Sequence, residues 1–385
     1  MDYFLSDRQK AIRELAQKIA VEKIKPVRAK YDESSEFPRE VLTEFAKAHL
    51  SGIFIPEKYG GAGDGCLGLC LAIEQIARIC AGICTTYAAT ALGSMPILVA
   101  GSEKQKEKYL PAIASGSALA AFGLTEANAG SDAGAIETTA VSDGDDYVLN
   151  GRKQWITNAG EADIYTVFAM TDKSRGSRGA TAIIVEKDTP GMSFGRTENK
   201  MGIRASLQRE VFFEDCRVPK ENVLGREGMG FVIAMKTLDS TRPGIGAQAV
   251  GLAQGAFDEA ISYARGRRQF GESITSFQAI QHMLADMATQ IEAARALVYA
   301  TARMIDAGSP NVGKESAMAK LFASDMAMRV TTDAVQIMGG YGYMKDYPVE
   351  KMMRDAKITQ IYEGTNQIQR NIIARHLIKE NAAGV

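Results

Sequence analysis

The spacing of apolar residues changes twice along this chain of 385 residues, and that change limits the fold more than any other feature. Up to about residue 119, and again from about residue 227, apolar side chains recur every three or four positions, the period of an amphipathic helix. Between 120 and 226, short β-branched and aromatic runs alternate with turn residues, which is typical of strands. We therefore expect an α+β multidomain protein. It should have an N-terminal all-α domain over 1–119, a middle antiparallel β domain over 120–226 and a C-terminal four-helix bundle over 227–385.

The N-terminal zone opens with a helix signal. Ser6 and Gln9 have the spacing of a capping box, in which two side chains bond reciprocally to the first turn of a helix. The face expected to be buried comprises Ile12, Leu15, Ala16 and Ile19. Further helices are expected through 38–49 and, in a stretch rich in alanine, cysteine and isoleucine, over about 67–92.

The middle and C-terminal zones differ in their turn residues. The pairs Asp143-Gly144 and Asn150-Gly151 predict turns, and no ten-residue helical pattern separates the expected strands, so antiparallel pairing is favoured over a β-α-β sheet. These strands cover 147–149, 164–168, 181–185 and 210–213. The expected C-terminal helices cover 247–265, 277–307 and 314–338, the last of them ended by Gly339-Gly340.

Composition and charge exclude several classes of protein. Hydrophobic residues make up 46% and charged residues 24%, the balance of a globular and not a disordered chain. The 45 basic and 46 acidic residues create no net field for nucleic acid or an anionic membrane. We find no apolar run close to the roughly 20 residues that a membrane helix needs, and no N-terminal signal segment. A bacterial cytoplasmic protein without membrane insertion is expected, although a mitochondrial matrix protein without its transit peptide would look the same.

Four of the five cysteines form two pairs with helical spacing. Cys66 with Cys70, and Cys80 with Cys84, could in principle supply thiolates to zinc or an iron–sulfur cluster. Metal sites favour closer spacing on tight turns, whereas cysteine is a common small buried residue. We therefore favour core packing and predict no metal site.

Three segments carry residues suited to chemistry, and each has a plainer interpretation. The loop Phe122–Asp132 is rich in small donors that suit a phosphate or the polar edge of a cofactor, or it is a turn into the β domain. Trp155, the single tryptophan, suits a planar ligand or a core. Glu363 stands between apolar residues and an expected helix start, so it is either a base with a raised pKa or a solvated loop acid.

Together these segments resemble the signatures of the acyl-CoA dehydrogenase family, over essentially the whole chain. The loop Phe122–Asp132 is similar to that family's flavin- and substrate-binding signature, with Phe122 in place of the usual tyrosine and Ala127 in place of the usual proline. Residues 361–370 resemble its catalytic loop. The segments that resemble its second signature are 336–342, 347–349 and 354–357.

The resemblance implies a catalytic base and two sets of contacts. Glu363 would remove the α-proton, because the helix position that carries the base in other family members is Thr241 here. The contacts implied for FAD are Phe122, Leu124, Thr125, Gly130, Ser131, Trp155, Ile156, Thr157, Thr365 and Gln367. Those implied for the FAD of a neighbouring subunit are Arg267, Phe270, Gln278, Gln336, Ile337, Gly339 and Gly340. The implied substrate contacts are Ser131, Asp239, Arg242, Tyr362 and Gly364.

For activity, the resemblance implies FAD-dependent dehydrogenation of an acyl-CoA thioester to the trans-2-enoyl-CoA, in the degradation of fatty or other carboxylic acids. An electron-transferring flavoprotein would accept the electrons, and FAD sharing between subunits implies a homotetramer. Residues 84–95 correspond to the region that lines the pocket for the acyl tail in relatives, and here they are mostly small. The absence of an arginine there disfavours a glutaryl substrate, whose distal carboxylate needs a counterion. The small side chains are compatible with a short- or medium-chain acyl group, or with an alicyclic or branched one such as cyclohexanecarboxyl-CoA. The alternatives are an acyl-CoA oxidase that uses oxygen, a catalytically silent FAD-binding scaffold, and a helical adaptor without cofactor.

Overall fold

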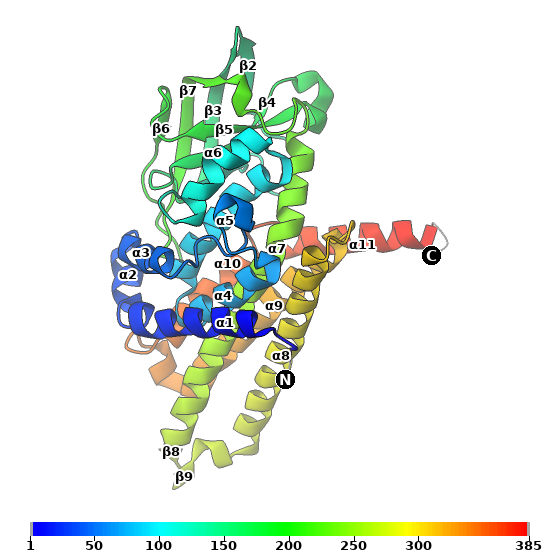
Figure 1. Cartoon of the computed structure of the whole chain (residues 1–385). Helices are drawn as coiled ribbons and strands as arrows, with labels where there is room; N and C mark the ends of the chain where they lie inside the picture. The colour runs from blue at the N-terminus through cyan, green and yellow to red at the C-terminus, as the bar shows by residue number, and fades with distance from the viewer. Residues whose placement is uncertain (1–2, 383–385) are drawn as a thin grey trace.

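A computed structural model describes residues 3–382 and shows helices, sheet and helices in the expected order (Figure 1). The sheet forms one end of the molecule, and the long C-terminal helices extend to the other end (Figure 1). The N-terminal helices lie around the middle of the molecule. The N-terminal elements are α1 (Asp7–Ile19), continued by a π-helical turn (Ala20–Ile24), α2 (Arg28–Ser34), α3 (Arg39–Lys47), α4 (Gly65–Ile79), α5 (Ala81–Ala100) and α6 (Glu103–Ala114).

The N-terminal helices confirm part of what the sequence predicts. Ser6 and Gln9 form the expected capping box at the start of α1. Leu15, however, is 38% exposed, so the buried face is narrower than expected. The helix expected over 67–92 is in fact two helices, because the backbone at Cys80 is extended, with φ −156° and ψ 106°, and ends α4 before α5 begins.

The helix α5 corrects the expectation about apolar runs. It spans 20 residues with a mean hydropathy of 1.5, so by length and composition alone it could cross a membrane. Within the structure, 67% of its most apolar stretch is buried, and it packs against β1 and α7. A helix that is apolar on all sides is also what the centre of a large protein requires.

The middle domain is a seven-stranded sheet with the order β1-β4-β2-β3-β7-β6, in which β5 pairs with β4. Its strands are β1 (Ala120–Gly123), β2 (Thr139–Asp143), β3 (Asp146–Thr157), β4 (Ile164–Met170), β5 (Ala180–Glu186), β6 (Met192–Phe194) and β7 (Gln208–Pro219). Most pairs are antiparallel, but β4 runs parallel to β1 and, at one residue pair, to β2. The expected antiparallel pairing therefore holds for most strands, and the parallel pair arises because β4 returns between two earlier strands and not beside its predecessor.

One of the two expected turns lies inside a strand. Asp143-Gly144 begins the β2–β3 hairpin turn, as expected. Asn150-Gly151 instead lies within β3, where the pairing with β7 shifts register. Gly151 has a φ of +148°, and a Cβ there would lie 2.7 Å from Cα of Thr138. A bulge that brings two backbones close together therefore explains this glycine.

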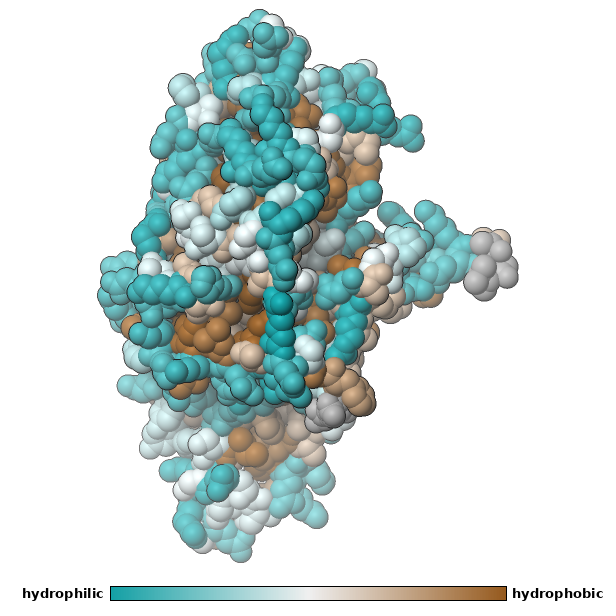
Figure 2. Space-filling model, viewed as in Figure 1, coloured by the Kyte–Doolittle hydropathy of each residue, from teal (hydrophilic) through white to brown (hydrophobic). Residues whose placement is uncertain are grey.

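The sheet is apolar on both faces. Along β4, Ile164 and Phe168 join the core that runs through the helical domains, whereas Tyr165 and Val167 belong to a second core on the opposite face. This division follows from the two-residue period of a strand. Outside these cores, hydrophilic residues cover most of the face that Figure 2 shows, with apolar residues gathered near the middle of the molecule.

The C-terminal domain is built from three long helices and two shorter ones. Its elements are α7 (Gly230–Gly266), a small hairpin of β8 (Arg268–Gln269) and β9 (Glu272–Ser273), α8 (Gln278–Asp306), α9 (Gly313–Met338), α10 (Val349–Thr359) and α11 (Asn366–Ala382). The expected bounds of α8 and α9 agree with these. The helix α7 begins much earlier than the expected residue 247 and continues through Pro243, a residue that ordinarily ends or bends a helix. Its 37 residues span about 55 Å at roughly 1.5 Å per residue.

Candidate active site

Glu363 lies between α10 and α11 in a backbone conformation that glutamate rarely adopts. Its φ is +52° and that of Gly364 is +93°, so two successive residues occupy the left-handed region. The carbonyl oxygen of Glu363 accepts hydrogen bonds from Nε of Arg242 at 3.3 Å and from Nε2 of Gln369 at 3.1 Å. A non-glycine residue held this way stores about 1–3 kcal/mol of strain, which is characteristic of functional sites.

The carboxyl group of Glu363 is shifted towards neutrality. Burial raises its pKa to about 7, although the Thr241 hydroxyl donates a hydrogen bond to Oε2 at 2.9 Å and the charges of Arg242 and Lys320 favour the ionised form. A carboxyl group with a pKa near 7 exchanges its proton close to neutral pH, which suits a general base. Glu363 is thus half-buried and partnered, and it is not a solvated loop acid.

Two charged residues of α7 lie next to this turn. Arg242 is 2% exposed, and its Nη1 lies 2.7 Å from Oδ1 of Asp239, one helical turn earlier. Burial lowers the pKa of Arg242 and raises that of Asp239, while their mutual attraction opposes both shifts. The structure therefore brings Asp239 and Arg242 to the turn that carries Tyr362, Glu363 and Gly364.

A chain of hydrogen bonds links this turn to the N-terminal domain. The hydroxyl of Tyr362 donates to Oε1 of Gln248 at 2.5 Å, and Nε2 of Gln248 donates to Oγ1 of Thr85 at 2.8 Å. Gln248 is fully buried on α7 and Thr85 is buried on α5. These three side chains connect the turn at 362–364, called the catalytic turn below because it carries the candidate base Glu363, to the region 84–95, where the resemblance would place the acyl tail.

A second group forms where the loop after β1 meets β3. The backbone N–H of Gln154 donates to the carbonyl oxygen of Thr125 at 2.8 Å. The next residue, Trp155, is 57% exposed and has a φ of +56°, so its ring is presented at the surface and not in the core. Thr157 follows on the same strand, and its hydroxyl accepts a hydrogen bond from Nε2 of Gln208 at 3.1 Å.

The other residues predicted for this group differ in exposure. Phe122 is half-buried, and Gly130 and Ser131 are exposed in the loop. The side chains of Leu124 and Ile156 are buried in the two cores, so only their backbone groups are placed to meet a ligand.

A buried ion pair, which the sequence did not reveal, fastens this loop to the sheet. Nζ of Lys153 lies 2.6 Å from Oε1 of Glu126 and 3.3 Å from the carbonyl oxygen of Leu124. The same carboxylate accepts backbone hydrogen bonds from Glu137 at 2.5 Å and Thr138 at 3.0 Å. Burial opposes ionisation of Glu126, but the Lys153 ammonium and these donors outweigh it and lower the pKa of the carboxyl group.

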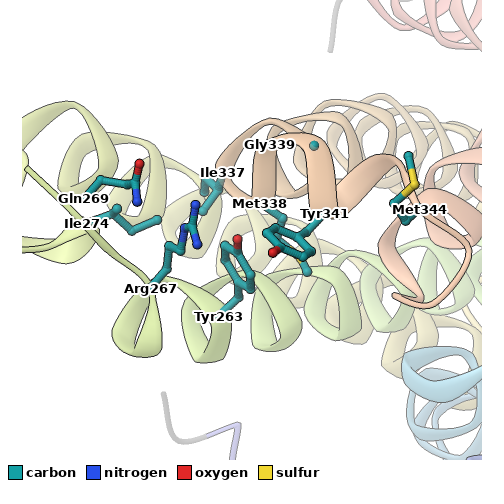
Figure 3. Close-up of a pocket in the computed structure, with 10 residues that line it drawn as sticks. Tyr263, Arg267, Gln269, Ile274, Ile337, Met338, Gly339, Tyr341 and Met344 are labelled. Carbon is teal, nitrogen blue, oxygen red and sulfur yellow. The ribbon is translucent and has the colours of Figure 1, made fainter.

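The third group lines a cavity of about 470 Å³ at the far end of α7 (Figure 3). Its lining includes Arg267, Ile337, Gly339 and Gly340. Figure 3 shows Arg267 projecting from α7 towards the segment after α9, and its guanidinium lies 5.5 Å from the centre of the Tyr341 ring.

The remaining predicted residues are placed around these groups. Phe270 is 95% exposed at the tip of the β8–β9 hairpin, Gln278 begins α8 and Gln336 is exposed near the end of α9. Thr365 accepts a hydrogen bond from the backbone N–H of Ile368 at 3.3 Å, and Gln367 is exposed. Figure 1 shows β3, which carries Trp155 and Thr157, in the sheet at one end of the molecule and the β8–β9 hairpin, which directly follows Arg267, at the other, so the structure does not bring these two groups together within one chain.

Sequence reasoning missed residues that contact the catalytic turn, two of them outside the recognised segments and one, Gln369, within 361–370 but given no role. Lys320 of α9 and Gln369 of α11 both bind backbone carbonyls of the turn, and Gln248 binds Tyr362. The sequence could have indicated Lys320 as a polar residue among apolar neighbours at a core position of a helix. Such a pattern does not predict which loop the side chain contacts.

The four paired cysteines lie on or beside α4 and α5. Cys70, Cys80 and Cys84 are buried, and Cys66 is half-buried. Burial raises the pKa of the Cys84 thiol, which donates to the carbonyl oxygen of Ile73 at 3.4 Å. Within residues 3–382, no group of three or more His, Cys, Asp or Glu side chains is arranged to hold a metal ion.

Family models match nearly the whole chain in the order of the three zones. The N-terminal domain of acyl-CoA dehydrogenase matches residues 6–117, the middle domain 121–216 and the C-terminal domain 228–378. The chain is 50% identical to the probable acyl-CoA dehydrogenase FadE25 of Mycobacterium tuberculosis, over 96% of this chain and 94% of that protein. It is 48% identical to the short-chain-specific acyl-CoA dehydrogenase of Clostridium acetobutylicum, over 98% and 100%.

Solved structures agree with these matches. The butyryl-CoA dehydrogenase of Megasphaera elsdenii superposes with a TM-score of 0.96 at 48% identity, over 98% of this chain and 100% of that one. A chain from work on the electron-transferring flavoprotein of Acidaminococcus fermentans gives 0.96 at 51% identity, over 98% and 99%. An acyl-CoA dehydrogenase of Bacillus anthracis complexed with FAD gives 0.94 at 37% identity, over 99% and 68%. With the fold, the order of its domains and a glutamate of raised pKa in the matching loop, this chain belongs to the acyl-CoA dehydrogenase family.

Proposed function

We propose that this enzyme dehydrogenates short-chain acyl-CoA thioesters, with Glu363 as the base that removes the α-proton. The observation that carries the proposal is the carboxyl group of Glu363, with a pKa of about 7 and a hydrogen bond from Thr241. Arg242, whose side chain binds the carbonyl oxygen of the same residue, and Asp239 would hold the CoA part of the substrate.

The residues fit FAD as the cofactor. The exposed Trp155 ring beside Thr157 suits a planar isoalloxazine. Arg267 and the bare backbone at Gly339 and Gly340, where an added Cβ would meet nothing within 4 Å, suit a pyrophosphate. The solved structure with FAD from Bacillus anthracis supports the same choice.

The chain's own groups account for proton removal. Thr241, Arg242 and Lys320 favour the ionised form of Glu363 before reaction, so its carboxylate is ready to accept the α-proton. Its backbone N–H would bind the thioester oxygen as enolate charge develops, which is stabilisation of the oxyanion type. Protonation then leaves a neutral acid, which the half-buried site tolerates better than a charge. The chemistry supplied by bound FAD is acceptance of the β-hydrogen with its electron pair.

The hydrogen-bonded bridge next to the base favours a short acyl chain. The half-buried Tyr362 and the buried Gln248 and Thr85 form a hydrogen-bonded bridge between the catalytic turn and α5. A longer tail would have to break this bridge and leave polar groups unpaired. The Clostridium and Megasphaera relatives, named for short-chain and butyryl substrates, support the same choice. Branched and alicyclic acyl groups remain the competing substrates.

We further infer an oligomer, in this family a homotetramer, that passes electrons to an electron-transferring flavoprotein in the bacterial cytoplasm. Support for the oligomer comes from Trp155 on β3 and Phe270 at the tip of the β8–β9 hairpin, because Figure 1 shows the sheet and this hairpin at opposite ends of the molecule. A second copy would supply the distant group to the FAD bound beside Trp155. The relative from the Acidaminococcus work supports the electron acceptor.

The test is anaerobic bleaching of the flavin by butyryl-, octanoyl-, isobutyryl- and cyclohexanecarboxyl-CoA. We expect the fastest bleaching with butyryl-CoA and a loss of about 10²–10⁴-fold in Glu363→Gln, the usual contribution of a general base. Glu380→Gln, an exposed acid of α11 paired with Lys314, is the matched control and should react normally. Full activity of Glu363→Gln would refute the base, and faster reaction with the cyclic substrate would refute the chain preference. Peroxide formed in step with substrate oxidation in air would identify an oxidase instead.

A further inference from the structure

Lys320 is a buried amine next to the catalytic turn. Its side chain is completely buried on α9, and its Nζ donates to the carbonyl oxygen of Gly364 at 2.8 Å and to Oδ1 of Asn366 at 2.8 Å. Lysine is almost never fully buried unless it is paired, because removing an ammonium group from water is costly. The two acceptors flank Thr365 and belong to the segment that leads from the base into α11.

Asn366 presents its oxygen to Lys320 because its amide nitrogen is occupied elsewhere. Nδ2 of Asn366 donates to Oγ of Ser324 at 2.9 Å and to Oδ1 of Asp325 at 2.7 Å. Asn366 is 3% exposed and Ser324 is fully buried. These bonds define the orientation of the amide, so the contact with Lys320 is part of a network and not a single chance pairing.

The carbonyl oxygens of the two left-handed residues accept hydrogen bonds from side chains of three different helices. Arg242 of α7 binds the carbonyl oxygen of Glu363, Lys320 of α9 binds that of Gly364, and Gln369 of α11 binds both. With φ values of +52° and +93°, the turn would relax without such partners. A Cβ at Gly364 would lie 2.7 Å from Nε2 of Gln369, so the turn is also closely packed.

We propose that Lys320 is a positioning residue that holds the peptide after Glu363 and thereby aims the catalytic carboxylate. The inference rests on the proposed role of Glu363 as the base. Lys320 itself touches no reacting atom, and it acts through the carbonyl oxygen of Gly364.

The charge of Lys320 gives this role a measurable signature. Burial lowers the pKa of Lys320 to about 7; Glu363 and Asp325 of its own helix raise it, and Arg242 of α7 lowers it further. In its charged form Lys320 lowers the pKa of Glu363, against the larger effect of burial, so its removal should raise that pKa further. If Lys320 only filled space in the core, its replacement would not change the midpoint of the pH profile of the reaction.

The experiment measures single-turnover flavin bleaching by butyryl-CoA from pH 5.5 to 9 in FAD-loaded Lys320→Met. We expect the rate at pH 7 to fall about 10–100-fold, as a displacement near 1 Å does at other active sites. The midpoint of the pH profile should move up, by at most about one unit, the usual effect of removing one fully charged opposite group. The KM for butyryl-CoA should stay within about twofold, because substrate contacts remain.

The control is Lys314→Met, which removes another lysine of α9 whose Nζ binds Glu380 of α11 away from the turn. It should leave both the rate and the midpoint unchanged. A normal rate and midpoint in Lys320→Met would overturn the inference. If that variant does not fold, Asn366→Ser removes one of the two acceptors that hold Lys320 in place and keeps the charge; we expect a lower rate at an unchanged midpoint, and a rate equal to that of the wild type would overturn the inference. The proposed role of Glu363 as the base is tested separately, because full activity of Glu363→Gln would refute it.

Discussion

Replacing Lys153 by methionine should destabilise the protein strongly, although it removes a single side chain from the interior of the sheet. Nζ of Lys153 lies 2.6 Å from Oε1 of Glu126, and the two side chains are 0% and 6% exposed. Methionine fills a similar volume but leaves the Glu126 carboxylate buried beside two backbone donors and no cation. Removing one partner of such a pair costs about 3–5 kcal/mol, because the remaining charge is uncompensated.

The assay is thermal unfolding of the FAD-loaded protein at a fixed FAD concentration, because bound cofactor shifts the midpoint. For unfolding of 385 residues as one unit, 3–5 kcal/mol corresponds to a Tm lowered by about 4–6 °C. The double variant Lys153→Met with Glu126→Gln removes both charges and keeps acceptors for the two backbone N–H groups. It should therefore recover at least about 1 kcal/mol relative to Lys153→Met, as a double-mutant cycle measures.

The control is Lys104→Met. Lys104 also pairs with a glutamate, Glu221, at 3.1 Å, but the two side chains are 83% and 65% exposed. Such an exposed pair contributes about 0–1 kcal/mol, so the Tm should change by no more than about 1 °C. Equal losses in Lys153→Met and Lys104→Met, or a double variant as unstable as the sum of its single changes, would refute the reasoning about buried charge.

Two further predictions concern the reaction. In the wild type, the rate of flavin bleaching should rise with pH through about 7, because burial raises the pKa of Glu363 to that value and only the ionised form accepts a proton; stopped-flow absorbance across pH 5.5–9 checks this, and a flat profile would contradict it. In Gln248→Ala, loss of the bridge between Tyr362 and Thr85 should open space, and the ratio of octanoyl- to butyryl-CoA turnover should rise about tenfold or more; an unchanged ratio would mean that the bridge does not limit the acyl pocket.

The order of the domains could be predicted from the sequence because it depends on local periodicity. The capping box at Ser6 and the bounds of α8 and α9 follow from spacing within a few residues. The parallel pairing of β1 with β4 and the break at Cys80 depend on contacts between distant segments. No local pattern encodes such contacts, so the prediction was wrong at those points.

The candidate site divides in the same way. Glu363 was found because it lies in a segment that resembles a family signature, and Arg242 because it matches a position that contacts substrate in that family; the structure brings the two together. Lys320 and Lys153 were missed because each lies on a regular element and contacts a loop far away in the sequence. A buried lysine is visible in the sequence only as an interruption of an apolar pattern, and its partner is decided by tertiary packing.

Both buried lysines bind the same kind of partner, which explains why an apolar side chain would not replace them. Lys153 binds the carbonyl oxygen of Leu124 in the loop after β1, and Lys320 binds that of Gly364 in the catalytic turn. Carbonyl groups in irregular segments have no helical or strand partner, and burying them unpaired costs about 1–3 kcal/mol each. A lysine on a neighbouring element supplies up to three donors at the end of a long side chain, so it can satisfy such a carbonyl and a second acceptor at once. Apolar replacements could pack as well, but they would release the loops that carry the proposed FAD contacts and the proposed base. The two lysines therefore link the helices and the sheet to the segments where we propose that the chemistry takes place.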